Sequence, residues 1–335
     1  MEKTVVVTGG TGYIAGFIMA EFLNRGYAVR ASVRDVARSE GLRKTLAGFV
    51  AGPDLSRFGV FPADLTSREG WAEAIAGTDG IIHVASPLGT GRESAAELRA
   101  VAETGTLNVL TAAEEAGVRR IVMTSSQAAS TPPAKSGKIV LDESYWSDEG
   151  NPELDPYRLS KIAAERAAWA FAENRGLKLT TILPGAVLGP VMSGDNISSN
   201  AILRALLDGG MPKLIDIPFQ TSDVRDLAVL HRLAFESEAA VGERFLAASR
   251  TIRMPEVARL YREKYPERKI PSKIFSGFAV RLLAKFVPRL RPLVPMLDRE
   301  YSHTCEKAER LLGWTQHSPS ETVLDAAESL LGMKD

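Results

Sequence analysis

A tyrosine and a lysine four residues apart, Tyr157 and Lys161, are the residues of this chain best suited by type and spacing to acid–base chemistry. They lie in the segment DPYRLSKIAAERAAWAFAENRG, where Asp155 and Pro156 predict a helix start and the alanine-rich run predicts a helix up to Gly176. Residues four apart share one face of a helix, so the ammonium can lie beside the phenol. A nearby positive charge favours the phenolate and is expected to lower the tyrosine pKa from its usual value of about 10. Such a tyrosine can donate or accept a proton.

This spacing alone is weak evidence, because it occurs by chance in many helices; the alternative is a partly exposed tyrosine beside a solvated lysine. The start of the chain favours the catalytic interpretation of Tyr157 and Lys161. Residues 3–8 form a β-branched run typical of a strand buried on both faces, and the stretch 9–16, GGTGYIAG, leads into an apolar helical pattern that ends at Gly26. In this context the glycines let the backbone approach a pyrophosphate, and the N–H groups at the helix start point at its charge. The sequence therefore predicts a dinucleotide-binding turn.

The end of the second predicted strand, residues 28–33, indicates which dinucleotide binds. A dinucleotide fold places its ribose-reading residue about here, and an acidic side chain would hydrogen-bond the ribose of NAD. This chain has Ser32 followed by Arg34: the small serine leaves room for a 2′-phosphate, and the guanidinium can bind it. The residues thus favour NADP over NAD. The alternative for Arg34 is a solvated loop arginine, and Arg38 and Lys44 are weaker candidates for supporting charge.

Strands and helices continue to alternate along the chain, and a polar or glycine-containing cluster follows each strand. This repetition predicts an α/β fold, a Rossmann-type doubly wound parallel sheet, with ligands at the carboxyl ends of its strands. We expect a long helix over residues 93–116. The remaining strands, each with the cluster that follows it, are residues 58–61 with 63–66, 80–84 with 85–87, 120–123 with 124–126, and 179–183 with 184–185.

The composition argues against several other classes of protein. Lysine and arginine total 41 against 41 aspartate and glutamate, so the net charge is zero and nothing favours a nucleic-acid partner. The single cysteine, Cys305, allows no intrachain disulfide, and neither it nor the four scattered histidines form a metal-binding pattern. We therefore expect no metal site.

The sequence also gives expectations about membranes. The first residues lead straight into a strand, without the basic, apolar and cleavage segments of a signal peptide. The most apolar stretch near the C-terminus, residues 275–297, is interrupted by basic residues and three prolines, which argues against a membrane span. A basic amphipathic surface segment is an alternative there, but we favour a helix and loop of a substrate-binding region. We expect a cytoplasmic protein with no membrane partner.

Several motifs together resemble one known family. The chain has TGGTGYIAG at the first turn, HVASP after the fourth strand, TSS after the fifth and YRLSK on the next helix. In this it resembles the extended short-chain dehydrogenase/reductase family, and more finely its dihydroflavonol 4-reductase-like branch, which includes cinnamoyl-CoA reductases and microbial aldehyde or ketone reductases. The finer resemblance is carried by GYAVRASVRD, FPADLT, TGTLNVL, RRIVMTSS, LPGAVLGP, SDVRDLA, GERFLAAS and KAERLLGW, which run nearly from end to end.

The resemblance implies NADPH-dependent reduction of an aldehyde or ketone carbonyl to an alcohol, with the hydride coming from the nicotinamide. It implies that Ser126 hydrogen-bonds the carbonyl, that Tyr157 donates the proton, and that Lys161 binds the nicotinamide ribose and lowers the tyrosine pKa. Two hydroxyl donors could then meet the alkoxide charge that develops on oxygen. The implied cofactor-binding residues are Thr8, Gly9, Gly12, Tyr13, Ile14, Arg34, Asp64, Leu65, Ala85, Ser86, Tyr157, Lys161, Pro184, Gly185 and Val187.

We expect the chain to divide into two parts. Residues 1–188, with 220–249 returning to them, are predicted to form the NADP-binding Rossmann domain. Residues 189–219 and 250–335 are predicted to form a smaller, mostly helical substrate-binding region. The apolar loops around the expected pocket suggest an apolar or aromatic carbonyl compound as the substrate. The chain is expected to be a monomer or a homodimer.

Two positions depart from the family pattern. Ala15 replaces the third glycine of the turn; we expect this small residue still to allow close packing, with Gly16 compensating. Gln127 follows the serine where the family often has a small residue, so it either reaches the substrate pocket or packs beside it. Pro87 and Leu88 are the other candidates for the pocket.

Three other functions share these motifs. An NAD-dependent nucleotide-sugar epimerase or dehydratase tends to have an acidic residue after the second strand, and a dehydratase an acid pair shortly after the serine, where this chain has Gln127, Ala128 and Ala129. A 3β-hydroxysteroid dehydrogenase-like enzyme differs mainly in its pocket. A dinucleotide-sensing regulator is disfavoured, because such proteins typically lose the tyrosine or the lysine. Ser125 is the alternative to Ser126 as the catalytic serine.

Overall fold

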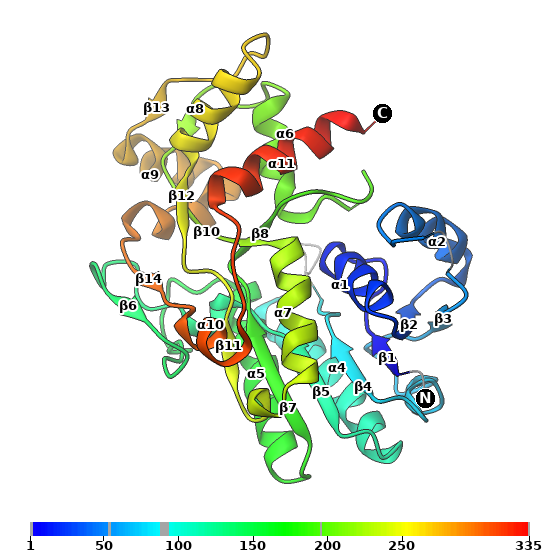
Figure 1. Cartoon of the computed structure of the whole chain (residues 1–335). Coiled ribbons are helices and arrows are strands. Elements are labelled where there is room, and N and C mark those ends of the chain that lie inside the picture. The colour runs from blue at the N-terminus through cyan, green and yellow to red at the C-terminus, as the bar shows by residue number, and fades with distance from the viewer. Residues whose placement is uncertain (1–2, 53–54, 88–93, 195, 334–335) are drawn as a thin grey trace.

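The computed structural model describes residues 3–52, 55–87, 94–194 and 196–333. Within these residues, seven parallel strands form one sheet in the order β11-β7-β5-β4-β1-β2-β3 (Figure 1). Their bounds are Thr4–Val7 (β1), Ala28–Val33 (β2), Phe58–Pro62 (β3), Gly80–His83 (β4), Arg120–Thr124 (β5), Lys178–Leu183 (β7) and Arg244–Leu246 (β11).

The chain builds this sheet outward from β1 in two directions. It runs from β1 through β2 to β3 on one side, then crosses to β4, β5, β7 and β11 on the other, so the strand order reverses between β1 and β4. This confirms the prediction of a doubly wound parallel sheet. The sequence predicted six of these strands; β11 was missed because three residues are too few to show a period, although they pair with Thr181, Ile182 and Leu183 of β7.

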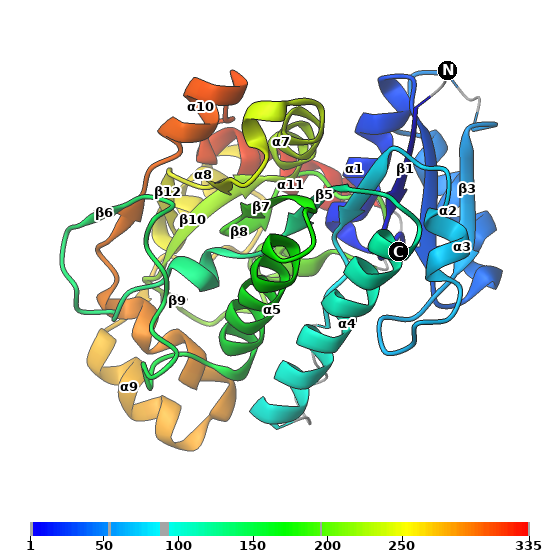
Figure 2. The ribbon, with the colours of Figure 1, turned by 90° about the horizontal axis from the view of Figure 1, so that it is seen from below.

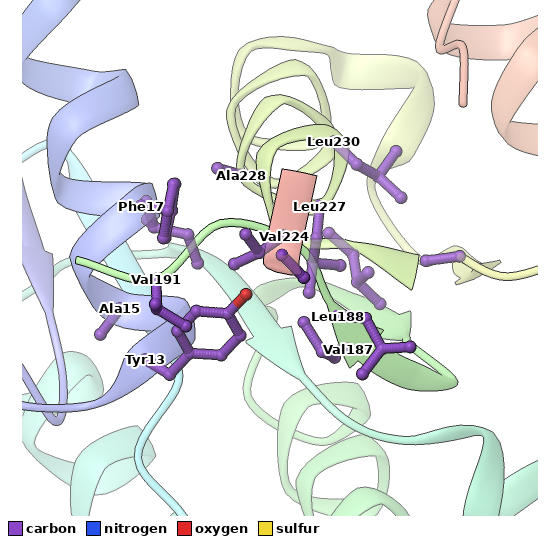
Figure 3. Close-up of a cluster of buried hydrophobic side chains, with 14 of the residues drawn as sticks. Tyr13, Ala15, Phe17, Val187, Leu188, Val191, Val224, Leu227, Ala228 and Leu230 are labelled. Atoms are coloured by element: carbon purple, nitrogen blue, oxygen red, sulfur yellow. The ribbon is translucent and has the colours of Figure 1, made fainter. Parts of the chain in front are cut away.

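Helices cover both faces of the sheet (Figures 1 and 2). One face carries α1 (Tyr13–Asn24), α2 (Ser39–Ala47) and α7 (Val224–Glu236), and the other carries α3 (Trp71–Ile75), α4 (Ala95–Glu115) and α5 (Pro156–Glu173). Figure 3 shows the buried side chains where α1 meets α7, among them Phe17, Val224 and Leu227. The long helix expected over 93–116 begins at Ala95, because Ser94 caps it in a capping box with Glu97.

Most of the described chain outside this sheet and its helices forms a second region, with small sheets of two or three strands. Its three-stranded sheet contains β8 (Ala186–Leu188), β10 (Pro218–Asp223) and β12 (Thr251–Arg253), and two strand pairs join β9 (Leu214–Ile215) to β13 (Ile274–Phe275) and β6 (Val140–Leu141) to β14 (Ser302–His303). Its helices are α6 (Ala201–Leu207), α8 (Met254–Lys264), α9 (Gly277–Phe286), α10 (Glu306–Leu312) and α11 (Pro319–Gly332). One continuous buried core joins this region to the face of the sheet that α1 and α7 cover. In the part of the chain that the structure describes, every helix is too short or too polar to cross a membrane.

A hydrogen-bonded joint attaches the C-terminal segment to the start of α7. Asp223 caps α7 by accepting a bond from the Arg225 backbone N–H (2.9 Å), and it also accepts bonds from the Arg225 guanidinium and the Thr322 hydroxyl. Asp226 accepts two bonds from His317, one from the backbone N–H and one at Nδ1, both 2.6 Å long. The potential ligand atoms of Asp223, Asp226 and His317 lie within 4.8 Å of one another. Since these bonds already occupy them, we interpret the group as a structural joint.

Candidate active site

The glycine turn between β1 and α1 is shaped to receive an anion. Gly9 has a φ of +72°, and a Cβ there would lie 3.0 Å from the Cβ of Ala85, so only glycine fits. Its N–H donates to the Ser32 hydroxyl (2.9 Å), which holds the turn against β2. Helix α1 then starts after Gly12 with no side-chain cap. The N–H groups of its first turn, including those of Tyr13 and Ile14, therefore suit a pyrophosphate.

Gly16 has a different role from the one expected. Ala15 is fully buried in α1, as a small residue in the third glycine position should be. A Cβ on Gly16 would lie 2.9 Å from Sδ of Met192, which belongs to the loop after β8. Gly16 therefore leaves room for the Met192 side chain beside α1. Tyr13 strengthens the same contact by donating its hydroxyl to the Pro190 carbonyl at 2.9 Å.

Thr8, at the end of β1, fixes the neighbouring end of β4. Its hydroxyl oxygen accepts bonds from the N–H groups of Val84 (3.0 Å) and Ala85 (2.9 Å), and it shares a further hydrogen bond with Nδ1 of His83 (3.0 Å). Burial lowers the pKa of His83 to about 3, with Lys161 acting in the same direction, so the imidazole is neutral. The backbone at Ala85, which leads into Ser86, is thereby held beside the glycine turn.

A cleft of about 280 Å³ lies beside the glycine turn. It is bounded on one side by Gly12 and Tyr13 and on another by Arg38 and Leu42. Arg34, which the sequence favoured, is exposed and lies near Asp64, whose pKa it helps to lower. Of these two arginines, Arg38 lines the cleft, whereas Arg34 lies near Asp64. The sequence signal for Arg38 was its place four residues after Arg34, just beyond the strand end.

Asp64 and Leu65 follow β3 in a tightly fixed turn. The Asp64 carboxylate accepts bonds from the backbone N–H (2.8 Å) and hydroxyl (2.6 Å) of Thr66, which lower its pKa. The Leu65 carbonyl accepts a bond from the Asn108 amide (2.8 Å), and a Cβ on Gly105 would lie 2.9 Å from the Leu65 Cβ. Gly105 and Asn108 therefore position the turn, a role the sequence reasoning did not assign although both lie in the motif TGTLNVL.

The ends of β5 and β7 are fastened together, which brings Ser126 to the same edge of the sheet. The N–H of Gln127 donates to the Pro184 carbonyl (2.9 Å), and the Ser126 hydroxyl accepts a bond from the Ala128 N–H (3.1 Å). Gly185 donates its N–H to the Ser222 hydroxyl (3.0 Å). A side chain at Gly185 would collide with the Gln220 carbonyl oxygen. Val187 follows in β8, paired with Ser222.

The three pocket candidates are placed as follows. The Gln127 side chain is buried, 8% exposed, and its amide donates to the Ala248 carbonyl at 2.7 Å. Pro87 is partly exposed after β4. Leu88 lies outside the described residues. The contact of Gln127 with Ala248 supports packing beside the pocket.

Helix α5 carries Tyr157 and Lys161. As predicted, Asp155 caps it, accepting a bond from the Arg158 N–H (2.8 Å), and Pro156 occupies the first helical position. Tyr157 is therefore in the first turn, partly buried, and Lys161 follows one turn later with only 6% of its surface exposed. The Lys161 Nζ lies 5.8 Å from the centroid of the Tyr157 ring.

The electrostatics of this pair differ from the expected direction. Burial raises the pKa of Tyr157, and a hydrogen bond with Ser126 only partly opposes that rise. Burial also lowers the pKa of Lys161 to about 8, against an upward effect of Glu165. The expected net lowering of the tyrosine pKa is wrong for this structure, because burial of the phenol outweighs the groups that favour the phenolate. Tyr157 is held as a protonated phenol, which is the form a proton donor needs.

A buried ion pair that the sequence did not predict supports the catalytic edge, by which we mean the strand ends and the start of α5 that hold Ser126 and Tyr157. Glu165 of α5 is fully buried and accepts bonds from the Ser125 hydroxyl (2.6 Å), the Thr181 hydroxyl (2.8 Å) and Nε of Arg244 (2.9 Å). Arg244 lies on β11, and its guanidinium stacks 3.7 Å from the Trp146 ring centroid. The pair ties α5 to three strands. Ser125 is committed to this network, which supports Ser126 as the serine that faces Tyr157.

The fold and this site define the class of protein. Residues 5–245 match the NAD dependent epimerase/dehydratase family, and the chain belongs to that family. The predicted resemblance to reductases of the extended short-chain dehydrogenase/reductase group is confirmed by the relatives described next.

Two curated relatives and one solved structure narrow the comparison. Cinnamoyl-CoA reductase 1 of Arabidopsis thaliana is 35% identical over 276 residues, which cover 81% of this chain and 77% of the relative. Dihydroflavonol 4-reductase of Zea mays is 33% identical over 325 residues, covering 91% and 89%. The crystal structure of Gre2 from Candida albicans in complex with NADPH is 26% identical, with a TM-score of 0.81 over 98% of both chains.

Proposed function

We propose that this protein reduces the carbonyl group of an aldehyde or ketone to an alcohol with NADPH. One observation carries the proposal: a protonated tyrosine, Tyr157, lies within hydrogen-bonding reach of Ser126 and one helical turn from Lys161, at the strand edge that holds the glycine turn. The relatives are consistent with it, since a cinnamoyl-CoA reductase and a dihydroflavonol 4-reductase are 35% and 33% identical to this chain, and Gre2 was solved with NADPH.

The residues present suit NADPH. The uncapped start of α1 offers N–H groups to the pyrophosphate, and the Gly9 turn leaves no room for a side chain at the point of approach. Arg34 and Arg38 supply positive charge for the 2′-phosphate. Asp64 and Leu65 would flank the adenine. Ala85, Ser86, Pro184, Gly185 and Val187 would lie along the rest of the cofactor, with the ribose near Lys161.

The chain's own residues then handle the oxygen of the substrate. NADPH, when bound, supplies the hydride that adds to the carbonyl carbon. As the C=O bond becomes a single bond, negative charge develops on oxygen, and the hydroxyls of Ser126 and Tyr157 can stabilise it. Tyr157 transfers its phenolic proton to that oxygen and completes the alcohol. The raised pKa of Tyr157 keeps the phenol protonated beforehand, and Lys161, one helical turn away, would bind the nicotinamide ribose.

An apolar or aromatic carbonyl compound is the substrate we favour. The relatives act, by their names, on cinnamoyl-CoA and on a dihydroflavonol, both of which are aromatic. The family also includes epimerases and dehydratases, but here Ser126 is followed by Gln127, whose amide binds the Ala248 carbonyl, and by Ala128 and Ala129. The acid pair that dehydration chemistry uses is absent from these positions.

The test is the loss of NADPH absorbance when purified protein meets a panel of aromatic aldehydes, aliphatic aldehydes, β-keto esters and a dihydroflavonol, run in parallel with NADH. We expect turnover with at least one aromatic carbonyl and a preference for NADPH. Silence across the panel, together with NAD retained through purification, would contradict the proposal and favour the epimerase or dehydratase function.

A further inference from the structure

Helix α9 is apolar on two opposite sides. Val280 and Ala284 lie one turn apart and are buried against the rest of the second region. The positions two residues away from these point the opposite way on a helix. There, Phe278, Leu282 and Phe286 follow one another at spacings of four and are 77%, 46% and 78% exposed. A surface helix normally places polar side chains on that side.

This exposure is concentrated in one place. Nine large hydrophobic side chains are exposed in the described part of the chain, and five of them lie within residues 274–286. Single exposed apolar residues are ordinary, whereas a contiguous group that includes two phenylalanines marks an interaction surface. Helix α9 lies at the outer rim of the molecule in both ribbon views (Figures 1 and 2), so an extended partner can reach it.

The same segment is strongly basic although the whole chain is neutral. Residues 268–297 contain seven lysine or arginine residues and no aspartate or glutamate. Arg281 and Lys285 border the apolar stripe along one edge of α9, as their spacing from Phe278 requires. Arg281 pairs with Asp298, while Lys285 makes no ion pair among the residues that the structure describes. The stripe is therefore flanked by positive charge on the solvent side.

We propose that this face of α9, formed by Phe278, Leu282 and Phe286 with Arg281 and Lys285, docks on the surface of a membrane that contains anionic lipids. A short helix with aromatic and aliphatic residues on one side and cations beside them is suited to lie in the interface plane. The ten-residue helix is about 15 Å long, which places the two phenylalanines about 12 Å apart. They enter the boundary of the acyl chains, and the cations remain at the phosphates.

A second copy of the chain is the competing occupant, and the charge argues against it. A symmetric contact through the stripe would bring Arg281 and Lys285 of one copy close to the same cations of the other. Like charges at an interface are unfavourable, whereas an anionic lipid surface supplies a phosphate to Lys285 and adds no like charge next to Arg281. From the sequence, a basic amphipathic surface segment over residues 275–297 was the alternative to a helix and loop of the substrate-binding region, and the exposed stripe favours that alternative.

Sedimentation with vesicles tests the proposal on the full chain. The vesicles contain either phosphatidylcholine alone or two parts phosphatidylcholine to one part phosphatidylglycerol, and the variants are Phe278→Ser/Phe286→Ser and Lys285→Glu. Val140→Ser is the matched control, since Val140 is 69% exposed on β6, outside this face. All substituted side chains are exposed, and circular dichroism with thermal melting verifies that each variant is folded.

We expect the wild-type chain and the Val140 variant to partition onto the anionic vesicles, weakly at high salt and onto neutral vesicles. Each α9 variant should bind at least about tenfold less. Three results would overturn the proposal: no binding by the wild-type chain, equal binding by wild type and both α9 variants, or self-association of the wild type in sedimentation velocity that the double phenylalanine variant abolishes. The last result would assign the face to a second copy.

Discussion

The carboxyl ends of the parallel strands and the outer face of α9 hold their side chains in opposite ways. At the strand ends, the hydroxyls of Thr8 and Ser222 each accept backbone N–H groups from a neighbouring segment, so one side chain fixes another strand's end. On α9, Phe278 and Phe286 contact little and face solvent. Hydrogen bonds within the protein thus fix the segments that would hold the cofactor. The outer face of α9, in contrast, leaves apolar side chains free to contact a partner.

Among the substitutions considered, Tyr157→Phe is expected to have the largest effect, a loss of carbonyl reduction. The substitution removes only the phenolic oxygen, so it deletes the proton donor and leaves the other cofactor-binding residues unchanged. We expect the rate of carbonyl reduction to fall about 10²–10⁴-fold, with the affinity for NADPH changed by less than about threefold. Stopped-flow turnover and fluorescence titration with NADPH measure the two quantities. Wild-type turnover by this variant would refute the assigned donor, and Tyr145→Phe serves as the control on a tyrosine outside α5.

Much of the strand-end site could be predicted because local signals agree with the fold there. The glycine turn, the helix start at Asp155 and Pro156, and the polar residues after each strand are patterns of neighbouring residues, and a parallel sheet brings its strand ends together without further information. The pairing of Glu165 with Arg244 joins residues 79 positions apart, and no local pattern carries it.

Two further features of the site could not be predicted from the sequence, because they depend on contacts made in the folded structure. The direction of the Tyr157 pKa depends on burial in the folded chain, which outweighs the lowering effect of the hydrogen bond with Ser126. The packing of Gly16 against Met192 likewise depends on how the second region meets α1. The exposure of the α9 stripe was unpredictable for the same reason, since periodicity shows that a side is apolar but not what covers it.

The next largest effect is expected from Glu165→Ala. The change leaves the Arg244 guanidinium buried without its carboxylate, and the Ser125 and Thr181 hydroxyls also lose their acceptor. We expect the free energy of unfolding to fall by about 3–5 kcal/mol, measured by urea denaturation. Glu149→Ala is the matched control, because Glu149 pairs with arginines at the surface and should cost less than about 1 kcal/mol. Equal losses would contradict the special role of the buried pair.

Substitutions of Arg34 and Arg38 test whether these residues bind the 2′-phosphate of NADPH. A guanidinium bound to a 2′-phosphate contributes about 2 kcal/mol, so removing either should raise the KM for NADPH about thirtyfold and leave the KM for NADH nearly unchanged. Steady-state kinetics of Arg34→Ala and Arg38→Ala with both cofactors decide the matter, with Arg68→Ala, whose exposed side chain pairs with Glu115, as the control. Equal effects on NADPH and NADH would dispose of the 2′-phosphate role for that residue.

The smallest expected effect is a gain in stability from Lys161→Met. Burial lowers the pKa of Lys161 to about 8, against about 10.4 in the unfolded chain. Below pH 8 both states hold the proton, and the fold carries the full cost of a buried ammonium. Between pH 8 and about 10.4 the unfolded chain binds more protons than the folded one, so the wild-type stability rises with pH.

Methionine has no such charge, so the variant should be more stable by about 1–2 kcal/mol at pH 7, less than the full shift implies because the surroundings relax. Its advantage should shrink steadily above pH 8, while carbonyl reduction is largely lost. Urea denaturation at several pH values measures the difference, with the exposed Lys135→Met as a control that should change little. A variant less stable than wild type at pH 7 would show that Lys161 stabilises the strand-end site. A more stable variant would instead show that the buried ammonium of Lys161 destabilises the fold and that the other hydrogen bonds and ion pairs of the site offset this cost.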